Sequence, residues 1–239
     1  MIKETSLNRV ERFWAAELSC LIDELASDQT RIVQRAGDES FVSLFRRKGA
    51  LHILCSPSLY KSVKGAVEVA DRVSLFDASF LEQLFRHRIK EIVGPAWIGY
   101  SDSVQVQSKA ELEVRLLKSS DHASLDRFAR ELTERDWEHS GLRHSQSIAC
   151  CYEGSDIIAA AGYDVWGSSI AHIGVVTHPS HRGKGIGKAV ASRIAEHAIA
   201  HDLVAQYRTL QWNRPSRAIA ASLGFEEYAR MIYVRMKAK

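Results

Sequence analysis

The sequence predicts an α/β or α+β fold in which helices flank a mixed central sheet. From residue 109 onward, stretches that alternate apolar and polar residues are separated by stretches with apolar residues at three- and four-residue steps. The first pattern is typical of strands and the second of amphipathic helices. The resulting order is β-α-β-β-β-α-β-α-β, which predicts a layered sheet. Residues 1–105 predict a smaller α/β accessory domain in front of a main domain at 109–239.

The N-terminal residues predict one long helix followed by short strands. The apolar spacing in Leu7–Ala26 favours a helix over the whole stretch. A second helix, capped by Asp77, is expected to run to about Ile92, and the Gly94-Pro95 pair then ends it. The extended segments are expected at Thr30–Arg35, Phe41–Arg46, Leu51–Cys55 and Trp97 to Val106.

The C-terminal residues supply the remaining elements. Ser120 or Asp121 caps a helix that ends with Trp137, Glu138 and His139. Further helices are expected at Gly187–Ala200 and at Ser216–Leu223, where Gly224 ends the second one. The strands are expected at Glu111–Leu117, Ser147–Tyr152, Asp156–Val165, Ser169–Thr177, Val204–Trp212 and Phe225–Met236, the last as a strand or a pair.

Composition excludes several classes of protein. The apolar fraction is 46%, the charged fraction is 26% and the net charge is +3, which are ordinary values for a soluble globular chain. The apolar runs are shorter than the roughly 20 residues that span a bilayer. Charged residues interrupt the N-terminus, so it does not resemble a signal peptide. Four irregularly spaced cysteines predict no disulfide framework. We therefore expect a cytoplasmic protein with no membrane contact.

Charge is distributed unevenly along the chain. Residues 1–108 are balanced, residues 109–177 carry a net charge of −4, and residues 178–239 carry +7. This asymmetry favours a site that holds an anion on one side and a cation on the other. Chance variation along a solvated surface is the alternative interpretation.

A glycine-rich turn is the most informative motif. A strand ending at Val175-Val176-Thr177 leads into Arg182-Gly183-Lys184-Gly185-Ile186-Gly187-Lys188, where a helix begins. Glycines let successive N–H groups point toward a ligand, and a helix N-terminus adds unsatisfied donors and partial positive charge. The pattern predicts a seat for a diphosphate. It does not match the nucleotide P-loop, because Ala189 follows Gly187-Lys188 and Arg182 occupies the position of the first glycine. It does not match the dinucleotide fingerprint, because the glycine spacing differs. A surface turn that contains glycines is the alternative interpretation.

Two ordered motifs resemble the GNAT N-acetyltransferase superfamily. The pattern V-x-x-P-x-x-R-G-x-G-I-G runs from Val176 to Gly187 and is similar to the acetyl-CoA loop of that superfamily. Asn213, Ser216 and the Leu223-Gly224-Phe225 run resemble its closing motif, N-x-x-[AS] followed by L-G-F. One helix and one strand separate the two motifs, as the superfamily requires. The resemblance covers residues 109–239 and identifies no acceptor.

The resemblance implies an acetyl-CoA site. Pantetheine is expected to pair with the strand at Val175, Val176 and Thr177, and a backbone N–H near Val175 or Val176 to face the acetyl oxygen. The neighbouring strand at Val204–Trp212 is expected to splay away. The residues expected to bind the cofactor also include Arg182, Gly183, Lys184, Gly185, Ile186, Gly187, Lys188, Asn213 and Ser216.

The catalytic residues match the superfamily less fully. Several members place a glutamate on the strand before the loop, and here the matching position is His172, which is a competent base. A strand histidine that a neighbour satisfies is the alternative. Many members carry a tyrosine seven residues after the motif asparagine, but this chain has Ala220 there. Tyr228 or Tyr233 is the candidate replacement, with Tyr228 preferred as general acid.

Fewer residues in the sequence bear on the acceptor and on metal binding than on the acetyl-CoA site. In the superfamily, the region matching Trp137 and Glu138 borders the acceptor, and acidic residues there favour a cationic amine. No metal site is expected, because the paired histidines lack a third ligand. We expect an acetyl-CoA-dependent N-acetyltransferase that acts on a primary amine of a small molecule or protein. The alternatives are a non-catalytic acetyl-CoA-binding module and, less favoured, a nucleic-acid-binding protein. The resemblance implies that residues 1–105 form an N-terminal domain that walls the acceptor pocket and that can be a degenerate copy of the same fold. A domain that forms a homodimer is the alternative.

Overall fold

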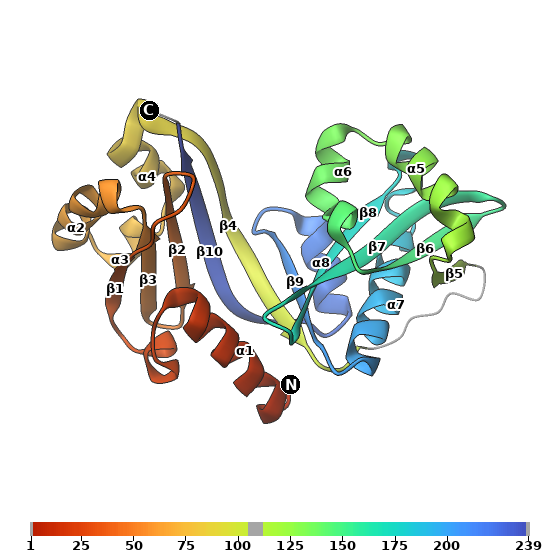
Figure 1. Cartoon of the computed structure of the whole chain (residues 1–239), viewed down its shortest axis with the longest axis horizontal. Coiled ribbons are helices and arrows are strands. Elements are labelled where there is room, and N and C mark those ends of the chain that lie inside the picture. The colour runs from red at the N-terminus through yellow and green to blue at the C-terminus, as the bar shows by residue number, and fades with distance from the viewer. Residues whose placement is uncertain (1, 105–111, 238–239) are drawn as a thin grey trace. The chain divides into compact units, whose positions relative to one another are not determined.

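The computed structural model describes residues 2–104 and 112–237 of the chain (Figure 1). These residues form two compact units, and each unit is assembled from separate segments of the sequence. Each unit contains strands of a mixed sheet flanked by helices, so the predicted fold class is confirmed. Unit 1 contains the residues up to Val10, Gly99–Arg208 and Arg214–Glu226, and unit 2 contains Glu11–Ile98, Thr209–Asn213 and the residues from Glu227 onward.

Unit 1 is built around five strands in the order β9-β8-β7-β6-β5. Neighbouring strands from β5 to β8 are antiparallel, whereas β8 and β9 are parallel. The strands span Glu113–Leu116 (β5), Ser147–Glu153 (β6), Asp156–Trp166 (β7), Ile170–Thr177 (β8) and Val204–Leu210 (β9), of which the last two residues belong to unit 2.

Helices cover both faces of these strands. α5 packs against β7 and α6 against β8, whereas α7 packs against β6, β7 and β8. Val176 joins the core under α5, but Val175 and Thr177 lie next to Gly187 of α7. Because successive strand residues point to opposite faces, α5 and α7 cover opposite faces. The helices span His122–Glu131 (α5), Glu134–Ser140 (α6), Ile186–Ala200 (α7) and Arg214–Ser222 (α8), with 3-10 turns at Ser119–Asp121, Leu142–His144 and Pro179–His181.

Unit 2 has strands in the order β1-β3-β2-β10-β4. β1 and β3 are parallel, whereas β2 is antiparallel to both β3 and β10. Apolar residues of β2, β3 and β10 pack with those of the helices into one core. The strands span Thr30–Gln34 (β1), Phe41–Arg47 (β2), Ala50–Cys55 (β3), Ile89–Ser101 (β4) and Glu226–Met236 (β10). The helices span Tyr60–Val69 (α2), Arg72–Leu75 (α3) and Ala78–Phe85 (α4), with 3-10 turns at Ile22–Ala26, Pro57–Leu59 and Arg86–Arg88.

Two predicted helices are shorter than expected. α1 spans Glu4–Leu18 rather than reaching Ala26, because Ser19 has a φ of 51°, in the left-handed region. Leu21 is 72% exposed and therefore does not continue the buried apolar stripe. The helix predicted to end near Ile92 ends at Phe85, and β4 begins at Ile89. Sequence patterning alone also missed α2.

Most predicted strands are present within the described residues, and Phe225–Met236 forms one strand rather than a pair. The strand expected from Trp97 begins earlier, at Ile89, and ends at Ser101, and the strand expected to reach Trp212 ends at Leu210. The predicted helix ending at His139 is two helices, because the chain is extended at Leu132 and Thr133 between α5 and α6. Val106, Lys109 and Glu111 lie outside the described residues. The division into domains at 1–105 and 109–239 stays a prediction. Within residues 2–104 and 112–237, no helix is long and apolar enough to cross a membrane.

Gly174 predicts a stability effect. A Cβ at this position would lie 1.7 Å from the backbone carbonyl oxygen of Ser140, at the end of α6. Because backbone cannot move aside as a side chain can, we expect Gly174→Ala to lower the free energy of unfolding by about 2 kcal/mol or more. Gly65→Ala is the matched control, since nothing lies within 4 Å of that Cβ and Ala favours a helix. Denaturant unfolding of both variants tests this, and equal stabilities would contradict it.

Candidate active site

The glycine turn opens helix α7. Gly183 and Gly185 have φ values of 77° and 81°, in the left-handed region that favours glycine. Gly185 is the N-cap residue, and no side chain in the described part of the chain caps this helix. The first backbone bond of α7 joins the Ala189 N–H to the Gly185 carbonyl oxygen at 3.2 Å. The N–H groups of residues 186–188 precede that bond and have no acceptor inside the helix.

This geometry suits an anion. The turn at Gly183, Lys184 and Gly185 is exposed, so a ligand can reach its backbone, and Lys188 is partly buried beside it. A Cβ on Gly183 would meet nothing within 4 Å, whereas a Cβ on Gly187 would lie 2.8 Å from Thr177 Oγ1. Gly183 therefore faces open space, and Gly187 lets α7 approach the end of β8 closely. Each hydrogen bond to a charged group contributes about 1.5–3 kcal/mol.

Arg182 ties the turn to two neighbouring elements. Its Nε donates to the Thr177 carbonyl oxygen at 3.1 Å, and its Nη2 donates to Asp136 Oδ2 at 3.0 Å. Burial raises the pKa of Asp136, but hydrogen bonds from Arg182 and Thr133 outweigh burial and leave that pKa lowered. The resemblance places the Arg182 N–H among the diphosphate donors, yet in the structure it donates to the Pro179 carbonyl at 3.4 Å.

β8 and β9 stop pairing partway along their length. Their parallel register begins at Ile170 with Val204 and ends at Ile173 with Tyr207. β8 continues to Thr177 and β9 continues beyond Tyr207. Residues 174–177 remain paired with β7 on the other side. The expected splay is therefore present, and it leaves one backbone edge of β8 without a β9 partner just before the glycine turn.

His172 lies beside the last paired residues of β8. Its Nδ1 is 2.7 Å from Gln206 Oε1, so Nδ1 donates and the neutral tautomer has its lone pair on Nε2. The imidazole stacks on Trp166, with ring centroids 4.1 Å apart. Burial is the main cause that lowers the pKa of His172 to about 4, and the hydrogen bond to Gln206 opposes it. The side chain is therefore neutral at pH 7.

Gln206 is a positioning residue that sequence reasoning missed. It is fully buried, and its Nε2 donates to the Tyr100 hydroxyl while its Oε1 accepts from His172. Cross-strand register puts Asp164, His172 and Gln206 in one row over three strands. The glutamine between Ala205 and Tyr207 gave no specific signal for this role, because the residues that it joins are far apart in the sequence.

The other predicted site residues have different surroundings. Trp137 packs against the core under α5, and Glu138 is exposed on α6. Ser216 Oγ lies 3.1 Å from the Tyr207 hydroxyl. Asn213 belongs to unit 2, where its N–H donates to the Leu210 carbonyl at 3.0 Å. Within unit 1, the structure thus brings the end of β8, the glycine turn and α6 together.

Tyr228 also lies in unit 2. The Arg47 guanidinium carbon is 4.3 Å from the centre of its ring, and the Phe45 ring centre is 6.4 Å away. Its role as general acid stays a prediction. In unit 1, Ala220 is fully buried at the position where the superfamily often has tyrosine, so that residue supplies no hydroxyl. Tyr207 is a phenol in unit 1 that sequence analysis did not select, and burial raises its pKa.

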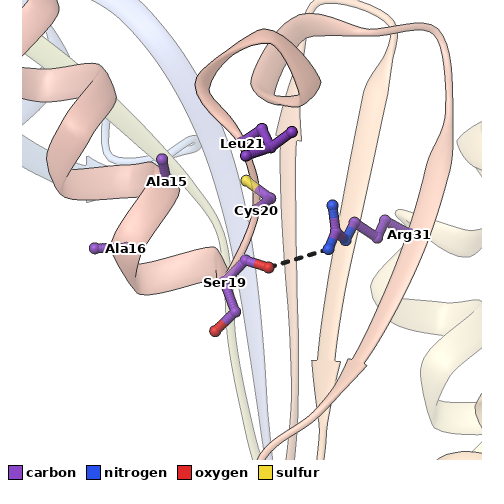
Figure 2. Close-up of a pocket in the computed structure, with 6 residues that line it drawn as sticks. All are labelled: Ala15, Ala16, Ser19, Cys20, Leu21 and Arg31. Atoms are coloured by element: carbon purple, nitrogen blue, oxygen red, sulfur yellow. Dashed lines mark hydrogen bonds between the residues drawn. The ribbon is translucent and has the colours of Figure 1, made fainter.

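A hollow in unit 2 and the metal-ligating side chains were the other candidate ligand positions, and neither belongs to the predicted site. Unit 2 has an open hollow of about 330 Å³, where Arg31 Nη2 donates to the Ser19 carbonyl beside Cys20 (Figure 2). Burial raises the pKa of the Cys20 thiol, which disfavours the nucleophilic thiolate. None of the predicted site residues lines this hollow. No group of three or more metal-ligating side chains is present among residues 2–104 and 112–237.

Comparison with known proteins identifies the fold of unit 1. The family model described as the acetyltransferase (GNAT) family matches residues 114–225. Residues 114–225 are a GNAT acetyltransferase domain. For residues 114–225, this match implies acetyl-CoA-dependent acetyl transfer. No curated protein matches the chain significantly.

Solved structures share the GNAT fold at low identity. A protein assigned to the GNAT acetyltransferases, from Novosphingobium aromaticivorans, is 20% identical with a TM-score of 0.52, and the match covers 64% of this chain and 67% of that one. A conserved protein of unknown function from Staphylococcus epidermidis is 9% identical with a TM-score of 0.51, and the match covers 69% of each chain. At these identities the likeness concerns the fold alone.

The N-terminus of α7 in the GNAT domain predicts a charge-dependent loss of binding. Gly185→Asp places a carboxylate beside the N–H groups of the turn. At about 4 Å, two like charges repel by about 4 kcal/mol at an effective dielectric constant of about 20. We therefore expect the Kd for acetyl-CoA, measured by calorimetry, to rise about a thousandfold or more. Gly185→Asn is the control, because Asn has a similar shape and also tolerates the left-handed region. Unchanged binding by a folded Gly185→Asp variant would refute the assignment of the loop.

Proposed function

We propose that the chain is an acetyl-CoA-dependent N-acetyltransferase that moves the acetyl group to a primary amine by direct attack. The observation that carries the proposal is the uncapped N-terminus of α7 directly after the diverging part of β8. A thioester ligand needs one seat for its diphosphate and one open strand edge for its extended arm. The turn at Gly183–Lys188 supplies the first, and Val175, Val176 and Thr177 supply the second.

In this proposal, residues on β8 have two roles: a backbone N–H stabilises the acetyl oxygen, and a side chain removes a proton from the amine. A backbone N–H of Val175 or Val176 stabilises negative charge on the acetyl oxygen as the amine attacks. The C–N bond then forms, the C–S bond breaks, and the thiolate leaves. An alkylamine has a pKa near 10.4, so a proton must be removed before or during attack. His172 Nε2 accepts that proton directly or through water, because Nδ1 is already committed to Gln206.

The leaving thiolate needs less help than the amine. With cysteine as the reference, a thiol has a pKa near 8.5, so the thiolate leaves readily near neutral pH. Tyr228 is the candidate donor from the final strand. Tyr207 is a second candidate, because its raised pKa keeps the phenol protonated and its register partner Ile173 forms the last pair before the strands diverge. Trp137 and Glu138 border the acceptor in this proposal, and acidic residues of α6 favour an incoming ammonium.

The proposed reaction predicts amine-dependent release of free thiol. The full chain is mixed with acetyl-CoA and a panel of primary amines, and free thiol is measured against the rate without amine. We expect at least one amine to accelerate release, and the same amine to give none with the Gly185→Asp variant. The replacement of the superfamily tyrosine by buried Ala220 favours one alternative, a module that binds acetyl-CoA without turnover. Tight binding without release across the panel would favour that module.

His172 predicts a separable effect on turnover. We expect His172→Ala to lower kcat about a hundredfold while the Kd for acetyl-CoA stays nearly unchanged. His201→Ala is the matched control, because His201 is exposed at the end of α7. Since the pKa of His172 is lowered to about 4, its basic form persists down to that pH. The wild-type pH–rate profile should therefore show no inflection near 6.5. Unchanged turnover in His172→Ala would remove this residue from its role.

A further inference from the structure

Arg208 lies where β8 and β9 separate. It directly follows Tyr207, whose pairing with Ile173 is the last in the register. Alternation along a strand puts Arg208 on the same face as Gln206, which contacts His172 and Tyr100. If pairing continued, Arg208 would stand opposite Gly174. The strands diverge instead. Arg208 therefore lies on the face of the sheet that carries His172, next to the place where the candidate acceptor site begins.

The guanidinium of Arg208 is partly buried without a carboxylate partner. Among residues 2–104 and 112–237, no ion pair or hydrogen bond joins it to an acidic side chain. Burial lowers the pKa of Arg208, and the nearby Tyr100 opposes that effect. The charge of Arg208 also contributes to the lowered pKa of His172, after the larger effect of burial. Buried charges are ordinarily paired, because desolvation is costly. A carboxylate on a bound acceptor would supply the pairing that no acidic side chain among the described residues supplies.

Charges of opposite sign flank His172. Asp164 is its register partner on β7, and Asp164 Oδ2 accepts from Trp166 Nε1 at 3.2 Å. Arg208 lies on β9, diagonal to His172. An amine at His172 and a carboxylate at Arg208 would therefore be bound on one face of the sheet by side chains from two neighbouring strands.

We propose that Arg208 binds a carboxylate of the acceptor, so that the acceptor is an amino acid or a similar small amine carrying a carboxylate. This inference rests on the proposed acetyl transfer and names the substrate class of the same site. The planar guanidinium forms two parallel hydrogen bonds with a carboxylate. A doubly charged phosphate fits less well, because Asp164 would repel it while attracting the ammonium of an amino acid.

The test compares matched acceptors. The twenty common L-amino acids and their carboxamides are offered as pairs with acetyl-CoA, and free thiol is measured. We expect at least one amino acid to exceed its carboxamide by about tenfold or more in kcat/KM. We expect Arg208→Gln to raise KM for that amino acid until its kcat/KM equals that of its carboxamide, with the Kd for CoA unchanged. Arg208→Lys should recover part of the difference. Arg127→Gln, which removes an exposed charge on α5, should change nothing.

Several results would overturn the inference while the proposed function stood. These are equal rates for every amino acid and its carboxamide, an equal loss for both in Arg208→Gln, or a loss of CoA binding in that variant. A second measurement separates the two proposals. The CoA-saturated chain is titrated calorimetrically with each N-acetyl-L-amino acid and its carboxamide. Binding that requires both the carboxylate and Arg208 supports the inference even if no thiol is released. Absence of both turnover and such binding would overturn it.

Discussion

Parallel strands β8 and β9 are held together for four residue pairs and then separate after Ile173 and Tyr207. His172, the open edge of β8 and the glycine turn lie along the chain around that point. A continuous sheet would use the backbone groups of Val175, Val176 and Thr177 to pair with β9. Because β9 departs, one edge of β8 can pair with an extended ligand while the other edge remains fixed on β7. The candidate site therefore lies where the regular pairing between neighbouring strands stops.

The chain reaches α7 at Ile186 through one 3-10 turn and the glycine turn after β8 ends at Thr177. A helix N-terminus attracts an anion through its dipole by about 0.3–1 kcal/mol at an exposed site. Hydrogen bonds to a charged ligand contribute about 1.5–3 kcal/mol each. Several donors together therefore outweigh the dipole. The positive φ values of Gly183 and Gly185 shape the turn that presents those donors, and Arg182 holds the turn against Thr177 and Asp136. Hydrogen bonds from the turn thus account for more of the expected affinity than the helix dipole.

Local patterns predicted the parts of the fold that depend on neighbouring residues. Strand alternation, the helix at Ile186–Ala200 and the glycine turn are encoded within short stretches, and the structure contains them. The separation of β8 and β9 was predicted from the resemblance to the GNAT superfamily, because the spacing of apolar residues does not indicate it. The helix predicted through Ala26 failed because periodic apolar residues continue past Ser19, where the backbone leaves the helical region. The hydrogen bonds of Gln206 and Asp136 join residues more than 30 positions apart, so no local pattern could have indicated them.

The central claim is that the N–H groups of the turn before α7 bind the diphosphate of CoA. The most direct measurement is the amide chemical shifts of the ¹⁵N-labelled chain during titration with CoA. The account predicts saturable shifts that are largest at Gly183, Gly185 and Gly187, with smaller shifts along Val175–Thr177. Saturable CoA binding that leaves those three glycine amides unmoved, with the large shifts elsewhere in the chain, would contradict it.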